Sequence, residues 1–479
     1  MNALPRWARV ADYLTLLLLA IALTVAASGG FRVRMGDWRI ALTSPYRVLI
    51  AAAALAVVRH VFARQEPVYR HVPTDIAAWF RSPAFRSAAA ALVGTRLAIL
   101  FIGYLAVVTF GYGRTKVPLR DYNSEILNLP LRFDTGWYLG IATDGYRYDP
   151  RAGERGQQNI VFFPAYPILT RVVALLLGNR ELSYIAAGTL ISFAAFLLAL
   201  VYLYRFARDE LLDDERSTLA LWLLAAYPFA LFYGAVYTES LYLLGVVAAF
   251  YHFSRREFHF AGAWGLLVGL TRPNGFLLAV PIGLLAIQPW LPRRLVRGDR
   301  SRDVPRGRRA EPRDLVPALA ASAMPVAGML VYSLFIWSLT GRPFAWAAGH
   351  AAWGREYRGL AELVTDRYNF ISRAGLGVYV AELPIDLLNG LGVVFVLATA
   401  WPVARRLGLP YAVFILVNML PPLAAGGLMS AGRFSSVLFP AFVWLAAVLP
   451  PRHRGAWLVT FAALQAFNAS LFYTWRQLY

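Results

Sequence analysis

Long apolar runs recur along the chain, and short polar segments separate them. Most runs are about 17–25 residues long, close to the length that a helix needs to cross the hydrocarbon of a bilayer, and 260–270 and 273–289 form a shorter pair broken by the "TRPNG" segment. The runs cover residues 12–28, 46–63, 88–112, 184–204, 217–234, 237–253, 260–270, 273–289, 315–337, 388–403, 410–427, 435–450 and 456–473. We therefore predict an all-α polytopic membrane protein with about 13 transmembrane helices.

The composition supports this class. Of the 479 residues, 58% are apolar and only 15% are charged, whereas a soluble domain carries about 25% charged residues. Cysteine is absent, which excludes a disulfide framework, a thiolate metal site and a cysteine nucleophile. The first run follows Arg6 and Arg9 and imitates a secretory signal peptide, but the many spans behind it favour a first transmembrane helix.

The placement of arginine predicts the orientation. Nine of these residues lie between positions 291 and 314, at 293, 294, 297, 300, 302, 306, 308, 309 and 313. We expect this segment to be a cytoplasmic loop that faces anionic headgroups. Nucleic-acid binding is the weaker interpretation, because no aromatic residues interleave with the arginines. With the N-terminus inside, the long loops 113–160 and 339–387 are external.

Four polar clusters fall on the external side in this topology. They are "RFDTGWYLGIATDGY" (132–146), "YTES" (237–240), "TRPNG" (271–275) and "SAGRFSS" (430–436). Ionisable groups near the membrane are costly, so they mark either a site or a paired structural role. For any one cluster alone, a helix-end residue that snorkels to the interface is the better explanation. Their convergence on one face predicts a shared cavity.

Asp134 is the candidate catalytic residue. A partly desolvated carboxylate among aromatic side chains is suited to act as a general base on a hydroxyl group. The alternative is that Asp134 or Thr135 caps a short amphipathic helix. Asp144 is a weaker candidate, because Asp-Gly is also a common turn. Arg272 and Arg433 each present paired N–H donors that suit a phosphate.

Further residues bear on the kind of substrate. Phe163 and Tyr166 lie in the aromatic stretch 159–173, which local evidence assigns to the interfacial belt, although such residues also stack on sugars or guide a polyprenyl chain. The six histidines lack zinc-ligand spacing. A nucleotide-binding glycine motif is also absent from the sequence. A group-transfer reaction would then use a lipid donor.

The segments 132–146, 161–169, 227–244 and 270–281 occur in the order seen in the PIG-V family. The chain resembles these integral-membrane mannosyltransferases of the GT-C type, and residues 432–442 show a weaker similarity. The family pattern begins with a Trp-Asp element; here Phe133 replaces the tryptophan, and Tyr138 stands at the later aromatic position. The first three spans look like additional N-terminal material or a rearranged start.

The resemblance implies a GT-C-like fold whose external loops bear short amphipathic helices. It implies that mannose or a similar sugar moves from a polyprenyl-phosphate donor to an acceptor on the non-cytoplasmic face, with inversion. Asp134 would be the base, Glu239 would orient a sugar hydroxyl or an arginine, and Arg272 or Arg433 would stabilise the departing phosphate. The predicted substrate-binding residues are Arg132, Trp137, Tyr138, Asp144, Phe163, Tyr166, Glu239, Arg272, Asn274 and Arg433.

Other expectations are coarser. The arginine bias indicates a bacterial protein, which we expect in the plasma membrane with the site facing outside. The expected acceptor is a lipid, a glycan or a protein. A divalent cation shared by Asp134 and Asp144 stays open, since no ligand set is evident. The alternative functions are a transporter or flippase with the clusters as its vestibule, and a non-catalytic scaffold. The expected parts of the chain are 1–112, 113–183, 184–290, 291–314 and 315–479.

Overall fold

The computed structural model describes most of the chain. The described residues are 5–28, 31–35, 38–42, 44–63, 65–67, 70, 72–113, 117–152, 156–211, 213–288 and 312–476. They form two compact units, one made of residues 1–86 and 169–187 and the other of residues 87–168 and 188–479. The predicted arginine-rich loop 291–314 lies outside the described residues except for its last three positions.

Seven helices of the described chain are long and apolar enough to cross a membrane. They are α2 (Pro45–Phe62), α4 (Pro83–Phe110), α8 (Glu181–Leu211), α14 (Leu315–Thr340), α18 (Pro384–Arg406), α19 (Leu409–Gly426) and α22 (Pro451–Tyr473). Shorter apolar helices are α7 (Ala165–Leu176), α11 (Phe258–Thr271), α12 (Ala279–Ile287) with the preceding turn Pro273–Leu278, and α21 (Phe439–Val448). A count of 13 full spans is thus not confirmed.

Two predicted spans are interrupted for the same reason. Residues 217–234 divide into α9 (Asp214–Ala225) and the 3₁₀ turn Ala230–Gly234, with Pro228 between them. Residues 435–450 divide into α20 (Ala431–Ser436) and α21, which has Pro440 in its first turn. Proline lacks the N–H that continues a helix, and each of these two breaks lies at or just before a proline. Helices α14, α18 and α19 instead continue through interior prolines.

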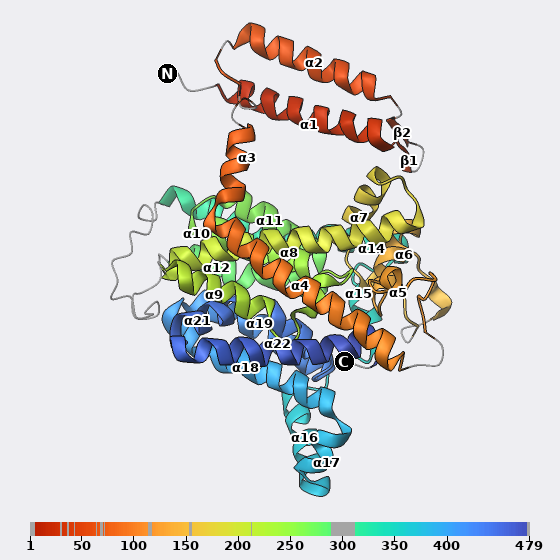
Figure 1. The fold of residues 1–479 in the computed structure, drawn as a ribbon, viewed down its shortest axis with the longest axis vertical. Coiled ribbons are helices and arrows are strands. Elements are labelled where there is room, and N and C mark those ends of the chain that lie inside the picture. The colour runs from red at the N-terminus through yellow and green to blue at the C-terminus, as the bar shows by residue number, and fades with distance from the viewer. Residues whose placement is uncertain are drawn as a thin grey trace. The chain divides into compact units, whose positions relative to one another are not determined.

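The first unit contains a helical hairpin and the only strands in the described chain. Helices α1 (Arg6–Ser28) and α2 lie side by side (Figure 1) and bury an ion pair in which Arg59 Nε lies 2.7 Å from Asp12 Oδ1. Between them, β1 (Phe31–Met35) and β2 (Trp38–Leu42) pair in antiparallel register, Phe31 opposite Leu42. The all-α prediction missed this hairpin, although its residues alternate between apolar and polar with a period of two. The short helix α3 (Val72–Arg81) follows.

The core of the second unit is a continuous buried segment. Every residue from 223 to 250 is buried, including most of α10 (Glu239–Ser254). Helix α10 packs on α11, and α11 packs closely on α14. A methyl group on Gly269 would lie 2.0 Å from the carbonyl oxygen of Pro325, so only glycine permits this approach.

Short helices of the connecting loops complete the second unit. Helices α5 (Glu125–Asn128) and α6 (Thr135–Asp144) follow α4, and α15 (Ala345–Ala348) with the turn Gly349–Trp353 follows α14. Helices α16 (Leu360–Ala374) and α17 (Leu376–Glu382) project together, and α16 has no buried residue (Figure 1). The predicted external loops therefore do carry short helices.

Candidate active site

Asp134 directly follows a residue with a strained backbone conformation. The preceding residue, Phe133, has φ of +46°, a left-handed conformation that costs a bulky side chain about 1–3 kcal/mol. Its ring is held against Phe472 and Trp475, with centroids 5.4 and 4.6 Å away. The N–H of Asp134 donates to Tyr237 Oη at 3.1 Å. These contacts fix the direction in which the Asp134 side chain points away from the backbone.

The carboxylate of Asp134 is not used as a helix cap. Asp134 occupies the N-cap position of α6, but its side chain makes no capping hydrogen bond. Instead, Oδ2 accepts a hydrogen bond from Arg433 Nη1 at 2.8 Å, and the side chain is 22% exposed. Asp134 therefore does not cap α6 with its side chain, and its carboxylate is paired with the guanidinium of Arg433 instead.

Glu239 forms ion pairs with two arginines of the site. Its Oε1 accepts from Arg433 Nε and lies 3.2 Å from Arg272 Nη1, and its side chain is fully buried. Oε2 of Glu239 has no hydrogen-bond partner in the described part of the chain. A buried carboxylate is tolerated when cations compensate it, and its place at the start of α10 adds the favourable helix dipole.

Aromatic rings support both guanidinium groups. Arg433 lies over the ring of Tyr237 at 4.5 Å from its centroid, and Arg272 lies over Tyr242 at 5.3 Å. Burial alone would lower the pKa of Arg433, but the carboxylates of Glu239 and Asp134 outweigh burial and raise that pKa above its ordinary value. Arg433 therefore stays charged.

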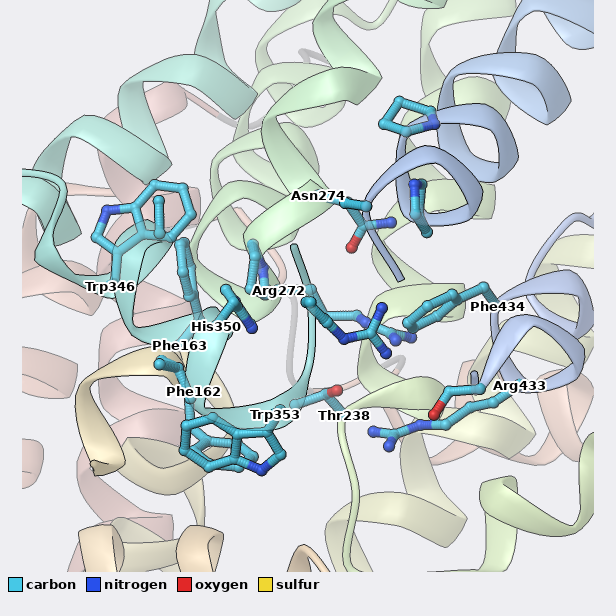
Figure 2. Close-up of a pocket in the computed structure, with 18 of the residues that line it drawn as sticks. Phe162, Phe163, Thr238, Arg272, Asn274, Trp346, His350, Trp353, Arg433 and Phe434 are labelled. Carbon is cyan, nitrogen blue, oxygen red and sulfur yellow. The ribbon is translucent and has the colours of Figure 1, made fainter. Parts of the chain in front are cut away.

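A cavity of about 540 Å³ opens beside this network (Figure 2). Asp134, Thr238, Arg272, Asn274 and Arg433 line it, so the structure brings together side chains from all four predicted polar clusters. The remaining wall is mainly apolar and aromatic, with Phe162, Phe163, Trp346, Trp353 and Phe434 among its members. Such a wall suits the ring faces of a sugar or an isoprenoid chain.

A third cation lines the cavity and was missed from the sequence. Arg355 follows the turn Gly349–Trp353 and lies over Phe434 at 5.0 Å from the ring centroid. Burial and then the neighbouring Arg433 and Arg272 lower the pKa of Arg355 to about 10, so the group is still protonated at neutral pH. Nothing in the local sequence distinguishes Arg355 from the other arginines of the long segment 339–387.

His350 lies in the same wall. Its Nε2 atom is buried and has no hydrogen-bond partner within the described ranges. Burial, followed by the charge of Arg355, lowers the pKa of His350 to about 4. The imidazole is therefore neutral at pH 7.

The other predicted site residues divide into two groups. Tyr138, Phe163 and Asn274 line the cavity, and Asn274 Nδ2 donates to Asn418 Oδ1 at 2.9 Å. Burial raises the pKa of Tyr138 to about 12, so its hydroxyl is protonated. Trp137 is not part of the lining but stacks on Phe162 at 5.7 Å, behind the aromatic wall.

Three predicted residues lie elsewhere. Arg132 is buried and its Nε donates to the carbonyl oxygen of Tyr473 at 2.8 Å. Tyr166 Oη donates to the carbonyl oxygen of Gly188 at 2.7 Å. Asp144, at the end of α6, is half exposed and lies 3.2 Å from Arg147. In the described ranges, no group of three or more histidine, aspartate or glutamate side chains could hold a metal ion.

Residues 115–289 match the family model described as mannosyltransferase (PIG-V). This match confirms the resemblance predicted from the sequence motifs and, together with the apolar helices, supports an integral-membrane glycosyltransferase. No curated protein matches the chain.

Solved structures of an archaeal oligosaccharyltransferase are similar at a low level. AglB from Archaeoglobus fulgidus in complex with an inhibitory peptide and a dolichol-phosphate has a TM-score of 0.40 and 14% identity, with 81% of this chain and 56% of that chain covered. The Archaeoglobus fulgidus oligosaccharyltransferase with Zn and sulfate has a TM-score of 0.39 and 15% identity, covering 80% and 53%. The chain spans about half the length of these structures.

Proposed function

We propose that this protein moves a mannose, or a similar sugar, from a polyprenyl-phosphate donor to an acceptor hydroxyl on the non-cytoplasmic face of the membrane. The acceptor belongs to a lipid, a glycan or a protein. The observation that carries the proposal is a partly exposed carboxylate, Asp134, that shares one cavity with three guanidinium groups, those of Arg272, Arg355 and Arg433. A base and a cationic surface for a leaving phosphate are the two requirements of such a transfer.

The reaction is a single displacement at the anomeric carbon. The acceptor oxygen forms the new bond to that carbon, and its proton passes to Asp134. The bond from the anomeric carbon to the phosphate oxygen breaks, and the polyprenyl phosphate leaves with the electron pair. Displacement from the opposite face inverts the configuration. Oδ2 of Asp134 is bonded to Arg433, which leaves Oδ1 as the oxygen that accepts the proton.

The helix ends support an external site. Helix α10 begins at Glu239 and ends beside Arg255 and Arg256, and α11 returns to Arg272. At 1.5 Å per residue, α10 separates the site from that arginine turn by about 24 Å. Helix α19 likewise begins after Arg405 and Arg406 and ends near the cavity residue Ala425. Arginine turns favour the cytoplasm, so the cavity faces the other side.

The test compares Asp134→Asn with Asp144→Asn in one assay. Purified protein is incubated with radiolabelled polyprenyl-phosphate mannose and total membrane lipids and glycans, and label transfer is measured. We expect Asp134→Asn to lower the rate by about 10²- to 10⁴-fold, the contribution of a general base, at normal expression. Asp144→Asn removes an equal charge outside the cavity and should transfer normally. Near-normal transfer by Asp134→Asn would refute the role of Asp134.

A further inference from the structure

Two of the three cavity arginines are already neutralised within the protein. Arg272 is paired with Glu239, and Arg433 is paired with both Glu239 and Asp134. Phosphate binding by either residue would compete with a carboxylate that is in place. The sequence pattern does not distinguish these paired cations from an available one, but the contacts do.

Arg355 has no such partner. No carboxylate of the described residues forms an ion pair with it, and its one side-chain hydrogen bond, from Nη2 to the carbonyl oxygen of Met429, is long at 3.5 Å. Together, Arg272, Arg355, Arg433, Asp134 and Glu239 carry three positive and two negative charges. The site therefore holds one uncompensated positive charge, and it belongs to Arg355.

The segment around Arg355 holds the guanidinium at the cavity. The N–H of Arg358 donates to the carbonyl oxygen of Ala424 at 2.9 Å, which ties the segment to the end of α19. Phe434 lies between two cations, since its ring faces both Arg355 and Arg272. The neutral His350 adds a buried ring nitrogen, Nε2, that has no partner in the described chain. Trp346 and Trp353 of the same segment supply an apolar, aromatic part of the wall of the cavity that Arg355 also lines.

We propose that Arg355, with His350 beside it, binds the phosphate of the lipid-linked donor, while Arg272 and Arg433 hold Glu239 and Asp134 in place. The inference rests on the proposed function, and it identifies one residue as the anion-binding group of the donor subsite. A guanidinium presents two parallel N–H donors to phosphate oxygens, and a neutral imidazole offers one further N–H. The isoprenoid portion would follow the aromatic wall.

The test measures binding without catalysis. The full chain in detergent micelles is titrated calorimetrically with farnesyl phosphate, farnesol and inorganic phosphate. We expect wild-type protein to bind farnesyl phosphate more tightly than either other probe, and Arg355→Gln to weaken farnesyl phosphate about 10- to 100-fold, the loss of one charged hydrogen-bonding group. Farnesol binding should not change. Tighter binding of inorganic phosphate than of farnesyl phosphate would contradict a lipid-phosphate subsite.

Two further variants keep the result interpretable. Arg358→Gln removes an exposed arginine from the same segment, outside the cavity lining, and should bind farnesyl phosphate as wild type does. Arg355→Lys keeps the charge but not the paired donors, so it should restore part of the lost affinity. Unchanged farnesyl phosphate affinity in Arg355→Gln overturns the inference. If that affinity falls but no sugar is ever transferred, the inference stands and the proposed function fails.

Discussion

Glu239→Gln is the substitution that tests the buried charge network most directly. The change keeps the shape of the side chain and removes the charge that compensates Arg272 and part of the charge that compensates Arg433. Arg433 would keep Asp134 as a partner, whereas Arg272 would lose the one carboxylate with which it pairs in the described chain. Both guanidinium groups are less than 10% exposed.

The magnitude follows from that asymmetry. Removing one partner of a buried ion pair costs about 3–5 kcal/mol, because the other charge is left uncompensated. The contact of Arg272 with the ring of Tyr242 is retained in the variant, so its cation–π energy of about 0.5–2 kcal/mol cancels in the comparison with wild type. Since only one of the two arginines is stranded, we expect the free energy of unfolding to fall by about 3 kcal/mol.

The assay is denaturation in mixed detergent micelles with increasing sodium dodecyl sulfate, followed by tryptophan fluorescence. Asp209→Asn is the matched control, because Asp209 and Arg255 form an ion pair at 3.4 Å in which each side chain is about half exposed. An exposed pair contributes about 0–1 kcal/mol, so the control should be close to wild type. Equal stability of the Glu239→Gln and Asp209→Asn variants would refute the claim that the network is energetically coupled.

Two other predictions concern pH and backbone contact. His350 has a pKa of about 4 in the fold, against an ordinary value of 6.5. As the pH falls below 6.5, the imidazole of the unfolded chain is protonated while that of the folded chain is still neutral, and this favours unfolding. The contribution of His350 to the stability of the fold is therefore complete above pH 6.5 and is lost as the pH falls toward 4. That loss is up to about 3 kcal/mol. In His350→Gln, the free energy of unfolding should change less with pH between 6.5 and 4. Identical pH profiles of the unfolding free energy in wild type and variant would contradict this prediction. Gly275→Ala places a methyl group 2.1 Å from the carbonyl oxygen of Val268 and should destabilise the fold by about 1–3 kcal/mol or more. Gly283→Ala, whose nearest neighbour is 3.9 Å away, should be neutral or slightly stabilising, and equal unfolding energies for the two glycine variants would contradict the close approach.

The elements that the sequence could predict are those with a local signal. Hydropathy locates most helices within a few residues, as at α2, predicted at 46–63 and found at Pro45–Phe62. The four polar clusters were also recognisable, because a charge next to an apolar run stands out wherever the run folds. The β-hairpin was missed because it lies between two predicted spans and is only five residues per strand.

Residues whose role depends on a distant partner could not be assigned from the sequence. Arg132 looks like a ligand beside Asp134, but its guanidinium bonds to the backbone of Tyr473, 341 positions away. Arg355 looks like one arginine of a long loop, and only contacts with the residues near α20 place it at the cavity. Local patterns carry no information about which acceptor a guanidinium will reach, whether a carbonyl, a carboxylate or a ligand.

The pairing of charges also changes the roles that the arginines can have. The sequence motifs offered Arg272 and Arg433 as equivalent phosphate ligands, yet both share the single oxygen Oε1 of Glu239. A phosphate that bound Arg433 would weaken its hold on Asp134 and free that carboxylate, whereas a phosphate that bound Arg355 would leave the network intact. The two arrangements differ in whether donor binding alters the base. In the wild-type protein, the pH dependence of kcat/KM for the donor reports the base before the donor binds, and the pH dependence of kcat reports the base with the donor bound. A shift in the apparent pKa of the base on donor binding would indicate that the phosphate reaches Arg433.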